Sequence, residues 1–291
     1  MKPIGVSERR GQHGLTFNLK VIQINLNRCK VAHDLLNQTI RDEKIDVAIM
    51  IEPNKKITQK ASWNYDLQTD VAIQVVNKKL VVEGCGKGAG FAWTKIKNIF
   101  IVGCYVSPNV CISELEKTLD GIGKLRTKNC IVLGDLNAKS SEWGCLKEDK
   151  RGVMINEWIA GKDMYVVNTG DKPTFQRRGQ SSIIDITIAG NEIKDLIKNW
   201  EVLDRESLSD HNYIYFEIEK GEMNKDELTK VKRHAGWRIK SLNKETLMNC
   251  IKAWSISDEV ACWEELNKTL TEACDLCMKR ASQKTSILVV I

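Results

Sequence analysis

Unbroken apolar runs alternate with amphipathic stretches along the first 220 residues. The runs at 47–51 (VAIMI) and 131–133 (IVL) are typical of strands that are covered on both faces. Apolar residues at helical spacing lie between 29 and 44, between 112 and 122, and between 153 and 159. This alternation of strands and helices predicts an α/β fold.

Further short strands are indicated by apolar residues between glycine-containing and Lys-Asn turns. They are 19–26, 70–76, 80–83, 89–94, 99–106, 165–167, 182–189 and 213–218. The four strands between 70 and 106 are expected to form an antiparallel meander. Because helices alternate with strands alongside such antiparallel pairs, we expect two mixed sheets and not one purely parallel, doubly wound sheet.

The pattern also divides the chain. Residues 1–17 are polar and are expected to be a flexible N-terminal segment, and 18–220 carry the strands and helices described above. Residues 221–243 are rich in Lys and Arg and are predicted to be a basic linker. Helical spacing of apolar residues then predicts a helical extension over 244–291.

Composition narrows the class of protein. The chain has 291 residues and a net charge of +6, which permits a polyanionic partner without requiring one. Its 10 Cys are scattered, and the N-terminus has no apolar segment typical of a signal peptide, so we expect reduced thiols in a cytosolic or nuclear protein. No apolar run approaches the roughly 18 residues that a membrane span needs.

Polar side chains stand at or beside six predicted strand ends or sheet edges. The clearest case follows the strand at 131–133, where Gly134 is succeeded by Asp135 and, two positions later, Asn137. In extended chain these two side chains would point the same way, although an ordinary Asp/Asn turn is the alternative. The other positions are Asn25, Glu52, Tyr105, Asp185, and Asp210 with His211.

If these ends converge, they bring together carboxylates, amides, a phenol and an imidazole. Carboxylate and amide oxygens are the ligands that Mg²⁺ accepts. Such a set, with one His, is typical of phosphodiester hydrolysis: the cation and the His neutralise charge in the transition state, while an Asp orients or deprotonates water. Uncatalysed phosphate-ester hydrolysis is so slow that several groups have to act together.

These motifs resemble, in the same order, those of the endonuclease/exonuclease/phosphatase family, which includes apurinic/apyrimidinic endonucleases and DNase I. They are QIN with Asn25, IEP with Glu52, YVSPN with Tyr105, GDLN at 134–137, IID at 183–185 and SDH at 209–211. IEP, GDLNAKSSEWG, PTF and SSIIDITIA further resemble the endonuclease domain of insect non-LTR retrotransposons that insert into ribosomal DNA or telomeric repeats. The resemblance covers about residues 19–220 and implies a four-layered sandwich of two mixed β-sheets flanked by helices.

The resemblance also implies roles for individual residues. Glu52, with Asn25 near it, would bind Mg²⁺ or, alternatively, Mn²⁺. Tyr105 would donate a hydrogen bond to the scissile phosphate. Asp135 would position and activate the attacking water, and Asn137 would hold that water or the phosphate.

The SDH motif supplies the remaining catalytic groups. His211 would contact a phosphate oxygen, and Asp185 would orient its imidazole, as buried carboxylates do. Asp210 would assist the metal or the water. Ser209 in this motif, and Asn109 in YVSPN, are expected to contact DNA.

The segment from Gln176 to Ser182 resembles the hairpin that retrotransposon nucleases insert into the minor groove. Arg177 and Arg178 would then contact phosphates or the groove. The alternative for both is a pair of solvated turn arginines.

Together these features lead to one functional expectation. The resemblance implies a Mg²⁺-dependent endonuclease that nicks one strand of double-stranded DNA and leaves a 3′-OH for target-primed reverse transcription. Its partner would be the reverse transcriptase domain of a parent polyprotein, and it would act in the nucleus after synthesis in the cytoplasm, without a membrane. The alternatives are an abasic-site endonuclease or other phosphodiesterase of this family, and a catalytically inactive DNA-binding module.

Overall fold

A computed structural model describes residues 17–61, 63–220, 238–253 and 263–279. The chain forms two compact units, Met1–Met223 and Asn224–Ile291. Nearly all of the expected flexible segment 1–17 lies outside the described residues, as does most of the expected basic linker 221–243.

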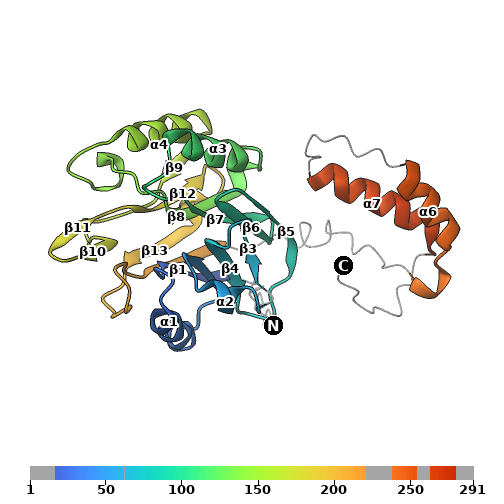
Figure 1. Ribbon diagram of the computed structural model, residues 1–291, viewed down its shortest axis with the longest axis horizontal. Helices are drawn as coiled ribbons and strands as arrows, with labels where there is room; N and C mark the ends of the chain where they lie inside the picture. Colours follow the sequence, from blue (N-terminus) through green and yellow to red (C-terminus); the bar gives the residue numbers. More distant parts are fainter. Residues whose placement is uncertain (1–16, 62, 221–237, 254–262, 280–291) are drawn as a thin grey trace, which may run out of the picture. The chain divides into compact units, whose positions relative to one another are not determined.

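The described residues of the first unit form two six-stranded sheets, a separate two-stranded hairpin and four α-helices (Figure 1). The first sheet has the order β13 (Ile197–Val202), β14 (Ile214–Lys220), β1 (Phe17–Asn25), β2 (Val47–Ile51), β4 (Val71–Val75), β3 (Asn64–Tyr65). The second has the order β5 (Val82–Gly88), β6 (Phe91–Ile96), β7 (Ile99–Tyr105), β8 (Cys130–Asp135), β12 (Asp185–Gly190), β9 (Met164–Val166). The hairpin is β10 (Phe175–Arg177) with β11 (Gln180–Ser182), and the helices are α1 (Lys30–Asp42), α2 (Lys55–Thr58), α3 (Ile112–Gly123) and α4 (Lys150–Gly161).

Three apolar clusters stack these elements into four layers. The inner faces of the two sheets pack on each other through residues such as Ile49 of β2 and Leu133 of β8. The outer face of the second sheet is covered by α3 and α4, and the outer face of the first by α1, with Leu36 fully buried. Burial on both faces explains the unbroken apolar runs, and it confirms the predicted α/β sandwich of two mixed sheets.

Three expectations about the strands need correction. The segment 70–76 does not begin a meander: β4 pairs with β2 in the first sheet, and only β5, β6 and β7 form an antiparallel meander in the second. Strand β13 was not predicted, because half of its residues are polar and do not alternate regularly with the apolar ones, and a bulge interrupts its pairing. Asp185 is the first residue of β12 and not the middle of a strand, since Ile183 and Ile184 separate β11 from β12.

Strand direction brings the polar strand ends to one edge of the sandwich. Strands β1 and β2 are parallel and align Asn25 with Ile51, the residue before Glu52. Strands β7 and β8 are also parallel and align Tyr105 with Asp135. Strand β12 is antiparallel to β8, so that its first residue is aligned with the last residue of β8.

Gly134 allows this alignment in the second sheet. A Cβ atom at this position would lie 1.9 Å from the carbonyl oxygen of Cys104 on β7. Any larger residue would therefore push β8 away from β7 directly beside Asp135.

The second unit is described over two helices, α6 (Lys244–Ala253) and α7 (Trp263–Cys277), which contact each other. The amide of Asn243, just before α6, donates a hydrogen bond to the carbonyl of Cys277 at the end of α7. Over the ranges that the structure describes, no helix has the length and apolar character to cross a bilayer.

Candidate active site

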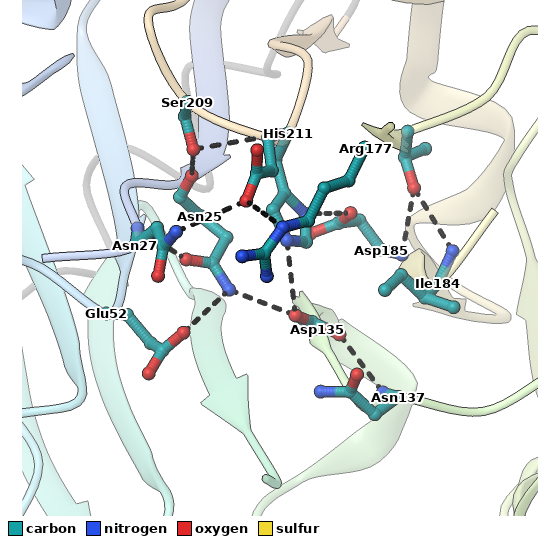
Figure 2. Close-up of polar contacts among 12 residues, drawn as sticks. Asn25, Asn27, Glu52, Asp135, Asn137, Arg177, Ile184, Asp185, Ser209 and His211 are labelled. Atoms are coloured by element: carbon teal, nitrogen blue, oxygen red, sulfur yellow. Dashed lines mark hydrogen bonds and ion pairs between the residues drawn. The ribbon is translucent and has the colours of Figure 1, made fainter. Parts of the chain in front are cut away.

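A cavity of about 750 Å³ opens at the edge of the sandwich where the polar strand ends meet. Its wall combines both sheets, the hairpin and the loops that precede β14. The lining residues are Asn25, Asn27, Glu52, Tyr105, Pro108, Asp135, Asn137, Lys139, Phe175, Arg177, Gln180, Ser181, Ser182, Ile184, Asp210 and His211. Asp185 contacts His211 from behind this wall (Figure 2).

Three buried ionisable groups form the centre of the site, and we call them the buried cluster: Asp135, Asp185 and His211. Nδ1 of His211 lies 2.8 Å from a carboxylate oxygen of Asp185, and Nε2 lies 3.8 Å from a carboxylate oxygen of Asp135. All three residues are at most 5 % exposed. The ring of Phe175 packs edge-on against the imidazole, with 5.0 Å between the ring centroids.

The cluster shifts the protonation of two of its members. Burial lowers the pKa of His211, but the charges of Asp185 and Asp135 and the hydrogen bond to Asp185 outweigh it and raise this pKa to about 9. Burial, followed by the negative charge of Asp185, raises the pKa of Asp135 to about 7. At neutral pH the imidazole is therefore protonated, while the Asp135 carboxyl sits near the midpoint of its titration.

Asn25 links the buried cluster to Glu52 across the two sheets. Its side-chain nitrogen donates to Asp135 over 3.0 Å and to Glu52 over 3.3 Å. Its side-chain oxygen accepts from the backbone N–H of Asn27 over 2.8 Å. In this geometry Asn25 holds both carboxylates, and it would offer its oxygen to a cation only after the amide rotates by half a turn.

Glu52 is held in an uncommon backbone conformation with φ +44°. Backbone hydrogen bonds fix it on both sides: its N–H donates to the carbonyl of Asp70, and its carbonyl accepts from the N–H of Arg28. The Arg28 guanidinium also lies 3.3 Å from the Glu52 carboxylate and 2.9 Å from that of Asp70. Left-handed backbone at a residue other than Gly is often found at functional sites.

Tyr105 faces Glu52 from the end of β7. Burial and the neighbouring charge of Glu52 raise the pKa of the Tyr105 phenol above its usual range. The hydroxyl therefore stays protonated at physiological pH and can donate a hydrogen bond.

Asn137 lies in the cavity wall, but not by the extended geometry that the sequence suggested. It has φ +48°, and its backbone N–H donates to the Asp135 carboxylate over 3.1 Å. This is the Asp/Asn turn that the sequence left open as an alternative. The turn is therefore present and Asn137 lines the cavity, while its catalytic role stays a prediction.

The remaining predicted residues divide into two groups. Ser209 donates to the carbonyl of Asn25, and Asp210 lies near the hairpin, with its carboxylate 3.6 Å from Nε of Arg177. Arg178 and Asn109 are exposed and are not among the residues that line the cavity.

Several supporting residues were missed by sequence reasoning. Thr174 accepts hydrogen bonds from the backbone N–H groups of both Ile184 and Asp185, each over 3.1 Å. Gln23, on β1, donates to the Asp185 carboxylate over 3.4 Å from the other sheet. Arg28 and Asn27 stood beside a predicted site residue in sequence, but only the fold shows what they contact.

The donor set fits a hard divalent cation. Ligand atoms of the buried cluster lie within 4.8 Å of one another. His211 is protonated and paired with Asp185, whereas the carboxylates of Asp135 and Glu52, which Asn25 bridges, line the cavity and can receive a cation. The raised pKa of Asp135 reflects buried negative charge without sufficient compensation, which a bound cation would supply.

A comparison with protein-family models matches the segment that supplies most of the residues lining the cavity. Residues 99–215 match the model of a family described as endonuclease-reverse transcriptase. No curated protein matches the sequence.

Solved structures show a likeness over more than two thirds of the chain. The endonuclease domain of TRAS1, a telomere-specific non-LTR retrotransposon, is 27% identical, with TM-score 0.60, over 69% of this chain and 98% of that domain. An AP endonuclease from Archaeoglobus fulgidus is 16% identical, with TM-score 0.55, over 68% of this chain and 98% of its own. A 3′-5′ exonuclease from Neisseria meningitidis is 15% identical, with TM-score 0.53, over 69% of this chain and 99% of its own.

Proposed function

We propose, from the premise that residues 17–220 carry a nuclease of the endonuclease/exonuclease/phosphatase type, that the protein nicks one strand of double-stranded DNA with the help of Mg²⁺. The observation that carries this proposal is the convergence of the buried cluster and Glu52 on one cavity. These groups come from four separate strand ends and would have no reason to meet if they were ordinary turn residues. Hydrolysis of a phosphodiester needs this combination of a base, a proton donor and negative charge for a cation.

The residues of the site divide the chemistry among them. Asp135, when ionised, accepts a proton from the attacking water, and Asn137 positions that water or the phosphate. Protonated His211, held by Asp185, donates a hydrogen bond to a phosphate oxygen and neutralises part of its developing charge. Neutral Tyr105 donates a second hydrogen bond.

Mg²⁺ is the cofactor that this oxygen-rich site would take, with Mn²⁺ as an alternative. Glu52 would hold it, together with Asn25 in a rotated amide orientation, and Asp210 would assist the metal or the water. When bound, the cation would supply positive charge that stabilises the leaving oxygen.

Double-stranded DNA as the substrate is supported by the endonuclease neighbour at 27% identity and by the hairpin beside the cavity. Arg177, Arg178, Asn109 and Ser209 are the proposed DNA contacts. We place the nick where it leaves a 3′-OH that can prime reverse transcription. The polymerase would be the reverse transcriptase domain of a parent polyprotein, which the description of the matching family model favours, and the reaction would take place in the nucleus.

The test is nicking of supercoiled plasmid by the full chain with Mg²⁺, with EDTA as the metal-free arm. Asp135→Asn and His211→Gln remove the proposed base and proton donor, and Asp34→Asn removes an exposed carboxylate on α1 as a matched control. We expect nicking by the unmodified protein and the control alone, and a nick that a polymerase extends without prior end treatment.

Two outcomes would support the alternative functions. Cleavage restricted to an oligonucleotide with an abasic site would favour the repair-like activity that the Archaeoglobus fulgidus neighbour is named for. DNA binding without cleavage of either substrate would favour an inactive DNA-binding module.

A further inference from the structure

We propose that Arg177 is the hairpin residue that binds a DNA phosphate beside the buried cluster, and that Asp210 holds its guanidinium until the phosphate displaces it. This inference rests on the proposed function, because it takes DNA as the ligand of the cavity. It assigns different roles to the two neighbouring arginines of the hairpin. It also gives Asp210 a task that does not involve the cation.

The backbone fixes Arg177 with respect to the site. The N–H of Gln176 donates to the carbonyl of Asp210, and the N–H of Asn212 donates to the carbonyl of Thr174, so β10 is joined to the SDH segment on both sides of Phe175. Phe175 forms a β-bridge with His211. At its base, the hairpin is therefore continuous with the part of the cavity wall that contains His211.

Alternation along β10 then separates the two arginines. Phe175 and Arg177 are two residues apart on a strand, so they share a face, and both line the cavity. Arg178 and Gly179 both have positive φ, at +48° and +78°, which forms a tight two-residue turn at the tip. This turn removes Arg178 from the alternation, and Arg178 does not line the cavity.

The side chain of Arg177 reaches back from the hairpin toward the site (Figure 2). Its Nε lies 3.6 Å from a carboxylate oxygen of Asp210, and the same oxygen accepts from the side-chain nitrogen of Asn27 over 3.3 Å. The two charged side chains are 57 % and 30 % exposed, so water screens their attraction. Such a pair contributes little to stability and exchanges readily.

A phosphate is the stronger partner for this guanidinium. It can accept two parallel hydrogen bonds from the guanidinium fork, whereas the ion pair with Asp210 uses only Nε at a long distance. The cavity wall also needs a cation, because Glu52, Asp135 and Asp210 all present negative charge to an incoming phosphate. The other basic residues that line the cavity are Lys139 and protonated His211, and neither belongs to the hairpin.

The test is a double-mutant cycle on DNA binding in EDTA, which separates binding from cleavage. Binding of a short fluorescent duplex is measured against NaCl concentration for the full chain. We expect Arg177→Gln to weaken binding about tenfold and to reduce the salt slope by roughly one phosphate contact. Arg178→Gln, the matched neighbour, should have a clearly smaller effect on both.

Asp210→Asn tests the holding role. It should tighten binding roughly two- to fivefold, which corresponds to the free energy of an exposed ion pair. This gain should persist in the Arg178→Gln background and fall by more than half in the Arg177→Gln background. Arg177→Lys should keep the salt slope but lose part of the affinity, because it retains the charge without the fork.

Equal gains from Asp210→Asn in both backgrounds would overturn the proposal, since Asp210 would then act as a simple charge. Equal effects of the two arginine variants would overturn it as well. The nicking assay keeps the two proposals apart: coupling between Asp210 and Arg177 in a protein that never nicks would reject the proposed catalysis but retain this binding role.

Discussion

The buried cluster and the hairpin lie along the same cavity but are built in different ways. The cluster sits at the junction of two sheets, its members are at most 5 % exposed, and His211 lies between the two carboxylates, 2.8 Å from Asp185 and 3.8 Å from Asp135. The hairpin is a two-stranded element with an exposed tip, whose conformation depends on a turn of two left-handed residues. The first arrangement shifts the pKa values of Asp135 and His211, and the second presents an exposed arginine side chain beside the cavity.

This difference separates what each region can contribute to function. Burial makes the cluster sensitive to any loss of a partner, because an unpaired buried charge is costly. Exposure makes each hairpin contact weak by itself and dependent on salt. We therefore expect large effects on the rate of cleavage from the cluster and small effects on affinity from the hairpin.

A large effect on cleavage without a matching effect on binding is expected of Asp185→Asn. It leaves the shape of the site nearly unchanged but removes the carboxylate that orients His211 and keeps it protonated. We expect cleavage of supercoiled plasmid to fall about 10³-fold, with DNA binding in EDTA altered less than threefold. A loss of binding as large as the loss of cleavage would show that the cluster also determines DNA affinity, contrary to this prediction.

The pH dependence of cleavage should follow the two shifted groups. Cleavage needs Asp135 ionised and His211 protonated, so without other limits the rate should fall below about pH 7 and above about pH 9. A bound cation would move the acidic limb downward, because it favours the ionised carboxyl. In Asp185→Asn the alkaline limb should move to lower pH, since the negative charge that raises the His211 pKa is gone. An alkaline limb that stays in place would assign that limb to another group.

Asp135→Asn should stabilise the fold while it abolishes cleavage. Burial raises the pKa of Asp135 in the folded state above its unfolded value, so the stability that this group contributes is present at acid pH and is lost as the pH rises through about 7. An uncharged amide avoids that loss. We expect Tm at pH 8 to rise by about 2–8 °C, measured by thermal unfolding of the metal-free protein. A fall in Tm would mean that the contact with His211 outweighs the cost of burying the charge.

The smallest expected effect is that of Gly179→Ala in the hairpin tip. A Cβ atom at this position would meet no heavy atom within 4 Å, so the cost comes only from the backbone, which has φ +78°. We expect DNA affinity to fall about two- to fivefold without a measurable change in Tm. A change in Tm of several degrees would show instead that the hairpin is integrated into the core.

Sequence patterns were sufficient for the strands that end at the site. The apolar runs at 47–51 and 131–133 are buried on both faces, and parallel neighbours place their ends at one edge. A polar residue directly after such a run therefore lies at or near that edge. For this reason Glu52 and Asp135 could be singled out as candidate site residues before the fold was known.

The supporting contacts could not be predicted, because they depend on how the sheets pack. Gln23 lies within β1 as one polar residue among apolar ones, and only the stacking of the two sheets brings it to Asp185. Thr174 acts by accepting hydrogen bonds from the backbone of another segment. Arg28 acts by pairing with carboxylates that are distant in sequence. Local spacing left the turn at Asn137 open only as an alternative, and it gave no indication that β4 belongs to the first sheet.

The central claim is that Glu52 of the first sheet holds a divalent cation beside the Asp135 carboxylate of the second, whose negative charge adds to its attraction. Titration of the full chain with Mn²⁺, followed by electron paramagnetic resonance of the free ion, tests this claim without relying on cleavage. We predict a tight site in the unmodified protein, weakened at least about tenfold by Glu52→Gln and by Asp135→Asn alike, and unchanged by Asp34→Asn. Wild-type Mn²⁺ affinity in either of the first two variants would contradict the claim.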